Sequence, residues 1–189
     1  SAILSEIPED QKRIREEFQV VSDPSKDSHP FFITARVSDS RNNGQYDYIK
    51  LKKEFFEEEE FVKHLSTMIQ SMYELNHPAI NHPYAYISGS SQATFKEDAY
   101  SIFEIFPRAV KGSPYVLFPS VNDNLKDYIT SLKDLSMTQK FIILYGIAAG
   151  MYHMHQNCFA HLNLNPKNIL LNDQLQPIIN LDITSRPKS

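Results

Sequence analysis

The pattern of apolar residues changes near residue 120, and this change constrains the possible folds more than any other feature of the chain. Before it, short apolar runs are separated by turn-forming residues, as in β-strands. After it, apolar residues recur with the spacing of helices. The sequence therefore predicts an α+β protein with two lobes. The expected parts are residues 1–17, a leader that is helical or disordered, then residues 18–121 and residues 122–189.

Five segments of the first lobe have the pattern of strands, and one has that of a helix. The expected strands are residues 18–21, 31–37, 46–51, 100–106 and 115–118. The first three should form an antiparallel meander, with a turn at the Asn-Asn-Gly of residues 42–44. Residues 57–75 carry apolar side chains at helical spacing and end before Pro78. We therefore expect a five-stranded antiparallel sheet with one amphipathic helix.

Two helices are expected in the second lobe. Residues 125–132 predict a short one. Ser136 and Gln139 have the spacing of a capping box, so Ser136 should cap a second helix at about residues 138–155. Because residues 141–151 are apolar nearly all round, this helix should be buried in protein rather than span a membrane.

Composition narrows the expected partners and compartment. The formal net charge is −4 and the lysines and arginines are scattered, so the basic surplus that binds nucleic acid or an anionic membrane is missing. One cysteine, Cys158, excludes an internal disulfide, and no apolar run is long enough to span a bilayer. The expected compartment is therefore the cytoplasm. The chain begins with serine, which suggests that it was cut from a longer protein.

Four short motifs resemble those of one known family. Residues 145–155 read YGIAAGMYHMH and residues 161–171 read HLNLNPKNILL. These resemble the helix and catalytic loop, usually HRDLKPENILL, of eukaryotic protein kinases, particularly the tyrosine-kinase-like serine/threonine group. Residues 75–78, LNHP, resemble the signature after the regulatory helix, and residues 48–50, YIK, resemble the Ala-x-Lys of the third strand. The resemblance implies a kinase-like N-lobe followed by the beginning of a helical C-lobe.

The resemblance also identifies substitutions in the catalytic loop. Kinases place an aspartate beside the acceptor hydroxyl, and Asn163 occupies that position. An amide has no basicity near neutral pH, so Asn163 is a degenerate proton acceptor. Asn165 occupies the position of the loop lysine and Leu162 that of the preceding arginine. Two cations that would stabilise developing charge are therefore missing.

The metal positions are incomplete in the same comparison. Asn168 matches the metal-binding asparagine, but Leu181 stands where the aspartate of the Asp-Phe-Gly motif is expected. Asp182 could replace it only if the loop at residues 172–176 has absorbed one extra residue, because a shift of one reverses the face of an extended segment. A lone amide oxygen is a poor magnesium ligand. We expect magnesium-assisted ATP binding to be weak or absent, so no cofactor is expected.

The nucleotide-binding positions are also altered. The resemblance places Lys50 and Leu117 at the nucleotide, but residues 22–30, in place of the glycine-rich loop, contain two aspartates and no glycine. Met68 stands where the glutamate partner of the strand lysine is expected. Lys50 then reads more simply as a surface lysine among neighbouring lysines.

Other polar residues have plain structural interpretations. His153 and His155 lie two apart on a helix and face different ways, so they do not form a metal site with Cys158. His161 should brace the catalytic loop by packing. The three loop asparagines could simply cap a turn.

The sequence predicts a catalytically impaired kinase-like domain, a pseudokinase, that serves as a scaffold or allosteric regulator by binding a protein. Another kinase is one candidate for that partner. The alternatives are a divergent serine/threonine kinase with residual ATP-dependent activity, and a non-functional truncated copy. The chain stops at Ser189, before the activation segment and the larger C-lobe helices of such kinases. We therefore expect exposed hydrophobic surface on the helix at residues 138–155.

Overall fold

The computed structural model describes nine stretches of the chain, which form two compact units. The stretches are residues 12–13, 17–22, 32–52, 71–87, 99–100, 115–121, 123–131, 134–181 and 186–187. Unit 1 comprises residues 1–66 and 83–120, and unit 2 comprises residues 67–82 and 121–189. Among the described residues, no helix is both long enough and apolar enough to cross a bilayer.

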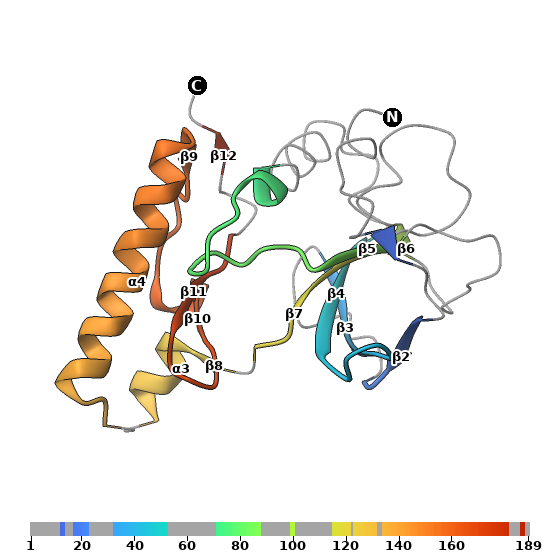
Figure 1. The fold of residues 1–189 in the computed structure, drawn as a ribbon, viewed down its shortest axis with the longest axis horizontal. Coiled ribbons are helices and arrows are strands. Elements are labelled where there is room, and N and C mark those ends of the chain that lie inside the picture. Colours follow the sequence, from blue (N-terminus) through green and yellow to red (C-terminus); the bar gives the residue numbers. More distant parts are fainter. Residues whose placement is uncertain are drawn as a thin grey trace. The chain divides into compact units, whose positions relative to one another are not determined.

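Unit 1 is built on one mainly antiparallel sheet (Figure 1). Its path runs β1–β5–β7–β4–β3–β2, and β6 pairs with β4 off this path. β1 pairs with β5 in parallel, whereas the other pairs are antiparallel. The strands are β1 (Lys12–Arg13), β2 (Phe18–Val20), β3 (Phe32–Asp39), β4 (Gln45–Lys52), β5 (Ala85–Ile87), β6 (Ala99–Tyr100) and β7 (Tyr115–Pro119).

The predicted meander is confirmed as β2–β3–β4, and its turn contains Asn43 with a positive φ of 55°. The strand count differs, because seven described strands join the sheet rather than five. The helical alternative for the leader is wrong at Lys12–Arg13, which pair with β5 as strand β1. An unpaired sheet edge offers backbone donors and acceptors to any nearby segment, so this pairing overrides a weak helical pattern.

The core of unit 1 follows from alternation along the strands. Phe18, Ala35, Val37, Ala85 and Leu117 form a buried cluster, with two tyrosines packed against it. Ala35 and Val37 lie two residues apart on β3 and so face the same side.

One buried carboxylate lies at the β3–β4 turn. Asp39 is fully buried, accepts a hydrogen bond from the Tyr84 hydroxyl at 2.7 Å, and accepts another from the Arg41 backbone N–H at 2.8 Å. The Tyr84 ring stacks on Tyr46 at a centroid distance of 3.8 Å. Hydrogen bonding and stacking together offset the cost of burying the charge and fix the turn.

Besides a helical turn at residues 71–74, the described part of unit 2 contains two longer helices and two small sheets. The helices are α3 (Leu125–Thr130) and α4 (Met137–Gln156), and a 3₁₀ turn η4 spans Pro166–Asn168. β8 (Asp123–Asn124), β10 (Ile169–Leu171) and β11 (Pro177–Ile179) form a three-stranded sheet in the order β11–β10–β8. β9 (Phe159–Ala160) pairs with β12 (Arg186–Pro187). Both predicted helices are confirmed within two residues at each end.

The capping box of α4 is confirmed in both directions. The Ser136 hydroxyl accepts from the Gln139 N–H at 3.2 Å, and the Gln139 side chain accepts from the Ser136 N–H at 2.9 Å. Two N–H groups that a helix start leaves without intrahelical partners are thereby satisfied.

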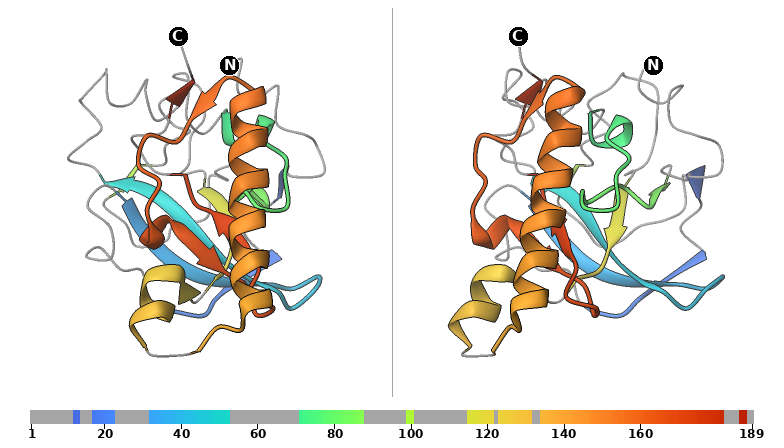
Figure 2. Two further views of the ribbon diagram at one scale, coloured as in Figure 1. Left: turned by 90° about the vertical axis from the view of Figure 1, so that its left-hand side faces the viewer. Right: turned by 60° about the vertical axis from the view of Figure 1, so that its left-hand side comes forward.

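One face of α4 packs on β11 and β9 (Figure 2). The other face is exposed. Ile143, Gly150 and Met154 are buried. The expectation of a helix buried all round is therefore wrong, while the expected exposed hydrophobic surface is confirmed. The exposed large apolar residues on α4 are Met137, Phe141, Ile142, Leu144, Tyr145 and Tyr152.

Residues 71–82 belong to unit 2 because they pair with β11. Of the helix expected at 57–75, residues 71–75 are described; residues 71–74 are helical and residue 75 is not. After them, the Ile179 N–H donates to the Ala79 carbonyl at 2.7 Å, and the Asn81 N–H donates to the Ile179 carbonyl at 2.8 Å. Ile80 forms a parallel bridge with Ile179, and both side chains are buried.

Candidate functional site: the loop between β9 and β10

His161 fixes the start of this loop from the inside of unit 2. Its side chain is 1% exposed. The Nδ1 atom accepts from the Asn163 backbone N–H at 3.3 Å, and Nε2 lies 2.9 Å from the Asn180 carbonyl oxygen. Because a backbone N–H can only donate, Nδ1 is unprotonated and Nε2 carries the proton that reaches Asn180. His161 is thus a neutral brace, which is the packing role that the sequence predicts.

The next two residues face solvent. Leu162 has a φ of 61°, a left-handed conformation that costs a leucine about 1 kcal/mol or more. Both Leu162 and Asn163 are exposed. The Asn163 carbonyl accepts from the side-chain amides of Asn165 and Asn168, each at 3.0 Å. Two amide donors from the same loop therefore hold the backbone of Asn163 in place.

Asn165 has a structural role. Its Oδ1 accepts from the Lys167 N–H at 2.9 Å and caps η4, while its carbonyl accepts from the Asn168 N–H at 3.0 Å. The prediction that loop asparagines cap a turn is confirmed for Asn165. This residue consequently supplies turn geometry in place of a positive charge.

Sequence reasoning missed two further asparagines that extend the network. The Asn168 carbonyl accepts from the Asn180 N–H at 2.8 Å, and the Asn180 side chain accepts from the Asn81 amide at 3.0 Å. Asn81 lies in the second of two Asn-His-Pro triplets, at residues 76–78 and 81–83. That local repeat was the available signal. Hydrogen bonds therefore connect the loop at residues 161–168, here called the catalytic-type loop, to the segment at residues 71–82 within unit 2.

The chemistry that this loop offers is limited. Residues 161–171 contain no carboxylate, and Lys167, which is exposed, is their one cation. Amides donate and accept hydrogen bonds but do not take a proton near neutral pH. The arrangement can bind polar groups, and its one imidazole, His161, is buried and contacts backbone groups through both ring nitrogens.

The position expected for the metal-binding aspartate is apolar and buried. Leu181 is 5% exposed, directly after the bonded Asn180. Asp182, the proposed substitute, lies outside the described residues, as does Met68. Asn168 is half-buried, and its Nδ2 donates to the loop backbone. The magnesium assignments of Asn168 and Asp182 stay predictions.

The two nucleotide-position residues lie in unit 1. Lys50 is in β4 opposite Ile33 of β3, and its side chain is not among those described. Leu117 is in β7, its side chain is fully buried in the core, and its carbonyl accepts from the Tyr84 N–H at 2.7 Å. Both nucleotide assignments also stay predictions.

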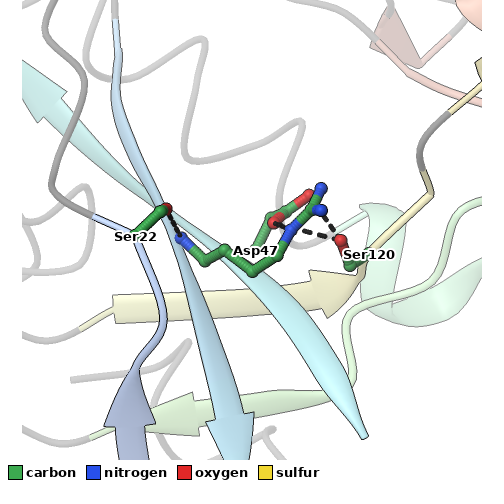
Figure 3. Close-up of polar contacts among 4 residues, drawn as sticks. Ser22, Asp47 and Ser120 are labelled. Carbon is green, nitrogen blue, oxygen red and sulfur yellow. Dashed lines mark hydrogen bonds and ion pairs between the residues drawn. The ribbon is translucent and has the colours of Figure 1, made fainter.

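Asp47 is a carboxylate close to Lys50 in sequence, and it forms interactions with Ser120 and Arg36. Figure 3 shows the Ser120 hydroxyl beside it, and each Asp47 oxygen lies 3.3 Å from that hydroxyl. The Arg36 Nε atom donates to Asp47 at 3.0 Å, and the Arg36 N–H donates to the Ser22 hydroxyl at 3.1 Å. Asp47 therefore cross-links β3, β4 and the end of β7.

The histidine and cysteine side chains near the end of α4 do not form one cluster. His155 and Cys158 are exposed, whereas His153 lies against His77 with ring centroids 5.1 Å apart. Among the described residues, no group of three or more His, Cys, Asp or Glu side chains could hold a metal ion.

Both the family model and the individual relatives that match this chain are protein kinases. The family model described as protein tyrosine and serine/threonine kinase matches residues 33–181. Serine/threonine-protein kinase 16 from Mus musculus is 36% identical over 86 residues, which are 43% of this chain and 27% of that protein. The protein of that name from Rattus norvegicus gives the same identity and coverage. The chain thus spans about a quarter of the length of these curated relatives.

Proposed function

Because the chain belongs to the family of protein tyrosine and serine/threonine kinases, we propose that it is a catalytically impaired kinase domain that acts by binding another protein. One observation carries the proposal. The catalytic-type loop is fully formed, with His161 bonded on both ring nitrogens, yet the residue at the proton-accepting position is Asn163. Local misfolding therefore does not account for the missing base.

The expected loss of activity is large. A positioned general base contributes roughly 10²- to 10⁴-fold to the rate of proton transfer in enzymes. Asn163 cannot supply this contribution, and the buried Leu181 offers no oxygen to magnesium. The loop positions Leu162 and Asn165 also lack the positive charge that would stabilise the transferring phosphoryl group. Each change opposes phosphoryl transfer for a separate reason.

The binding half of the proposal is supported by the exposed face of α4. Met137, Phe141, Leu144, Tyr145 and Tyr152 have exposed fractions between 63% and 78%. Gathered apolar side chains on one helix face are typical of contacts with further protein, which is either the remainder of a kinase C-lobe or a separate partner. The proposed partner is a protein, with another kinase as one candidate, and the proposed compartment is the cytoplasm.

A divergent active kinase is the second candidate, and the retained Asn168 and the intact loop favour it. The two candidates are separated by a phosphotransfer assay on the whole protein with labelled ATP and magnesium. Lys50→Ala is the matched background, and Lys52→Ala, two residues further along β4, controls for loss of a lysine from this strand. Impairment predicts that the unaltered protein and Lys50→Ala incorporate the same small amount of phosphate.

Incorporation well above Lys50→Ala, retained in Lys52→Ala, would overturn impairment and support the divergent kinase. Thermal unfolding with millimolar ATP, with and without magnesium, gives an independent readout of nucleotide binding. A ligand that binds only the folded state raises its stability by RT ln(1 + [L]/Kd), which is about 2.7 kcal/mol at one hundred times Kd. We expect no magnesium-dependent change in melting temperature.

A further inference from the structure

A pair of histidines outside the catalytic-type loop joins two segments of unit 2. His77 follows the helical turn at residues 71–74, and His153 lies on α4. Their rings are 5.1 Å apart between centroids and tilted by 32°. The Nδ1 atom of His77 accepts from the Ala79 backbone N–H at 3.0 Å. Because that N–H can only donate, this contact requires His77 to be unprotonated at Nδ1.

The environment of His153 on α4 also disfavours a positive charge on the pair His77 and His153. The Nε2 atom of His153 is buried and has no hydrogen-bond partner in the part of the chain that the structure describes. Burial lowers the pKa of His77 below its ordinary value of 6.5, and the charge of His153 lowers it further. Geometry and electrostatics therefore favour the same neutral state of His77.

The other titratable side chains on these elements do not neutralise a positive charge on His77. On the segment they are Tyr73, Glu74 and His82, of which Glu74 is exposed and His82 contacts Tyr73 through both its ring and Nε2. On α4 the remaining titratable side chains are Lys140, Tyr145, Tyr152 and His155, and all are exposed. β10 and β11 carry none.

The contact between His77 and His153 lies beside the hydrogen bonds that hold residues 79–81 to β11. Ala79 donates to His77 with its N–H and accepts from Ile179 with its carbonyl. A proton on Nδ1 would set two donors against each other at Ala79. It would also place a positive charge against the His153 ring. Protonation therefore weakens the attachment at its first residue.

From this juxtaposition we propose that His77 and His153 form an acid-sensitive latch, which holds residues 75–82 on α4 and β11 only while His77 is neutral. The latch is independent of phosphoryl transfer, since neither histidine belongs to the catalytic-type loop. Acidification in the range where histidines titrate would release the segment locally before the whole unit unfolds.

The direction of the effect follows from proton linkage. The open segment binds a proton with the ordinary affinity of histidine, whereas the closed segment binds it more weakly. Stability of the closed segment is therefore complete above about pH 6.5 and falls as the pH decreases below it. One proton taken up on opening changes the opening equilibrium about tenfold per pH unit.

The test is amide hydrogen exchange of the whole chain between pH 7.5 and 5, corrected for the intrinsic pH dependence of exchange. The Asn81 and Ile179 amides report directly, because they form the hydrogen bonds between the segment and β11. We expect their protection to fall by up to tenfold per pH unit below pH 6.5. His77→Asn keeps an oxygen that can accept from the Ala79 N–H but takes no proton, so its protection should not depend on pH.

Two further variants keep the proposal falsifiable if His77→Asn fails to fold. His153→Gln should reduce the pH dependence, because it removes the second ring and its charge. His155→Gln, at an exposed position on the same helix, should leave it unchanged. A pH dependence in His77→Asn or His153→Gln equal to that of the unaltered chain would overturn the latch. So would a loss of the pH dependence in His155→Gln.

Discussion

Gly150 lies where α4 closely approaches β11 and residue 79, and replacing it with alanine tests how tightly these parts of unit 2 are packed. A Cβ atom there would lie 2.7 Å from Ile179 Cδ1, 3.2 Å from the Ala79 carbonyl oxygen and 3.3 Å from Ala79 Cβ. Ile179 is fully buried, so its side chain cannot swing into solvent. Alanine at this position must therefore displace packed atoms.

Two opposing contributions set the magnitude for Gly150→Ala. Alanine in a helix interior is about 1 kcal/mol more favourable than glycine. Overfilling a packed core costs about 1–3 kcal/mol. We expect a net loss of about 1 kcal/mol in the free energy of unfolding. Ala148→Gly, on the exposed face of the same helix, should also lose about 1 kcal/mol, but through propensity alone.

A double-mutant cycle with Ile179→Val separates overlap from propensity. Ile179→Val removes the Cδ1 atom and alone should cost about 1 kcal/mol. In the double variant the vacated space receives the new methyl group, so we expect the double loss to be about 1 kcal/mol smaller than the sum of the single losses. Urea unfolding followed by circular dichroism gives the four free energies. Additivity within about 0.5 kcal/mol would refute the packing argument.

Three further changes test other contacts, each by urea unfolding of the whole chain. Ser136→Ala removes the α4 cap and should cost about 1 kcal/mol, whereas Thr138→Ala, also exposed in the first turn, should change stability little. Tyr84→Phe leaves the buried Asp39 without its hydroxyl donor and should cost about 1.5–3 kcal/mol, and an unchanged midpoint would contradict this bond. Leu117→Ala should cost about 2–5 kcal/mol, because its side chain is fully buried, and a smaller loss would contradict its place in the core.

Local patterns in the sequence were sufficient for several elements. The meander β2–β3–β4 follows from alternating residues and an Asn-Asn-Gly turn, and the α4 start follows from Ser136 and Gln139. These features depend on interactions within a few residues, so a sequence pattern encodes them directly. The family followed from contiguous motifs, and the match over residues 33–181 confirms it.

Features that join distant segments depended on the tertiary structure. The pairing of β1 with β5 joins residues more than seventy positions apart, and no local pattern marks it. The asparagine network joins Asn81 to Asn180, and the side on which α4 is buried depends on where β11 lies. Both outcomes depend on which surfaces meet, and a single helix or loop does not specify its own neighbours.

In the candidate site, too, some features follow from the sequence and others follow only from the tertiary structure. The sequence by itself determined which chemical groups the loop carries, because an asparagine at residue 163 is an amide in any fold. Only the tertiary structure decided that the loop is formed around a buried His161, and that the Leu181 side chain is buried in the core. Chemical identity belongs to each residue, whereas burial and hydrogen-bond partners belong to the whole fold.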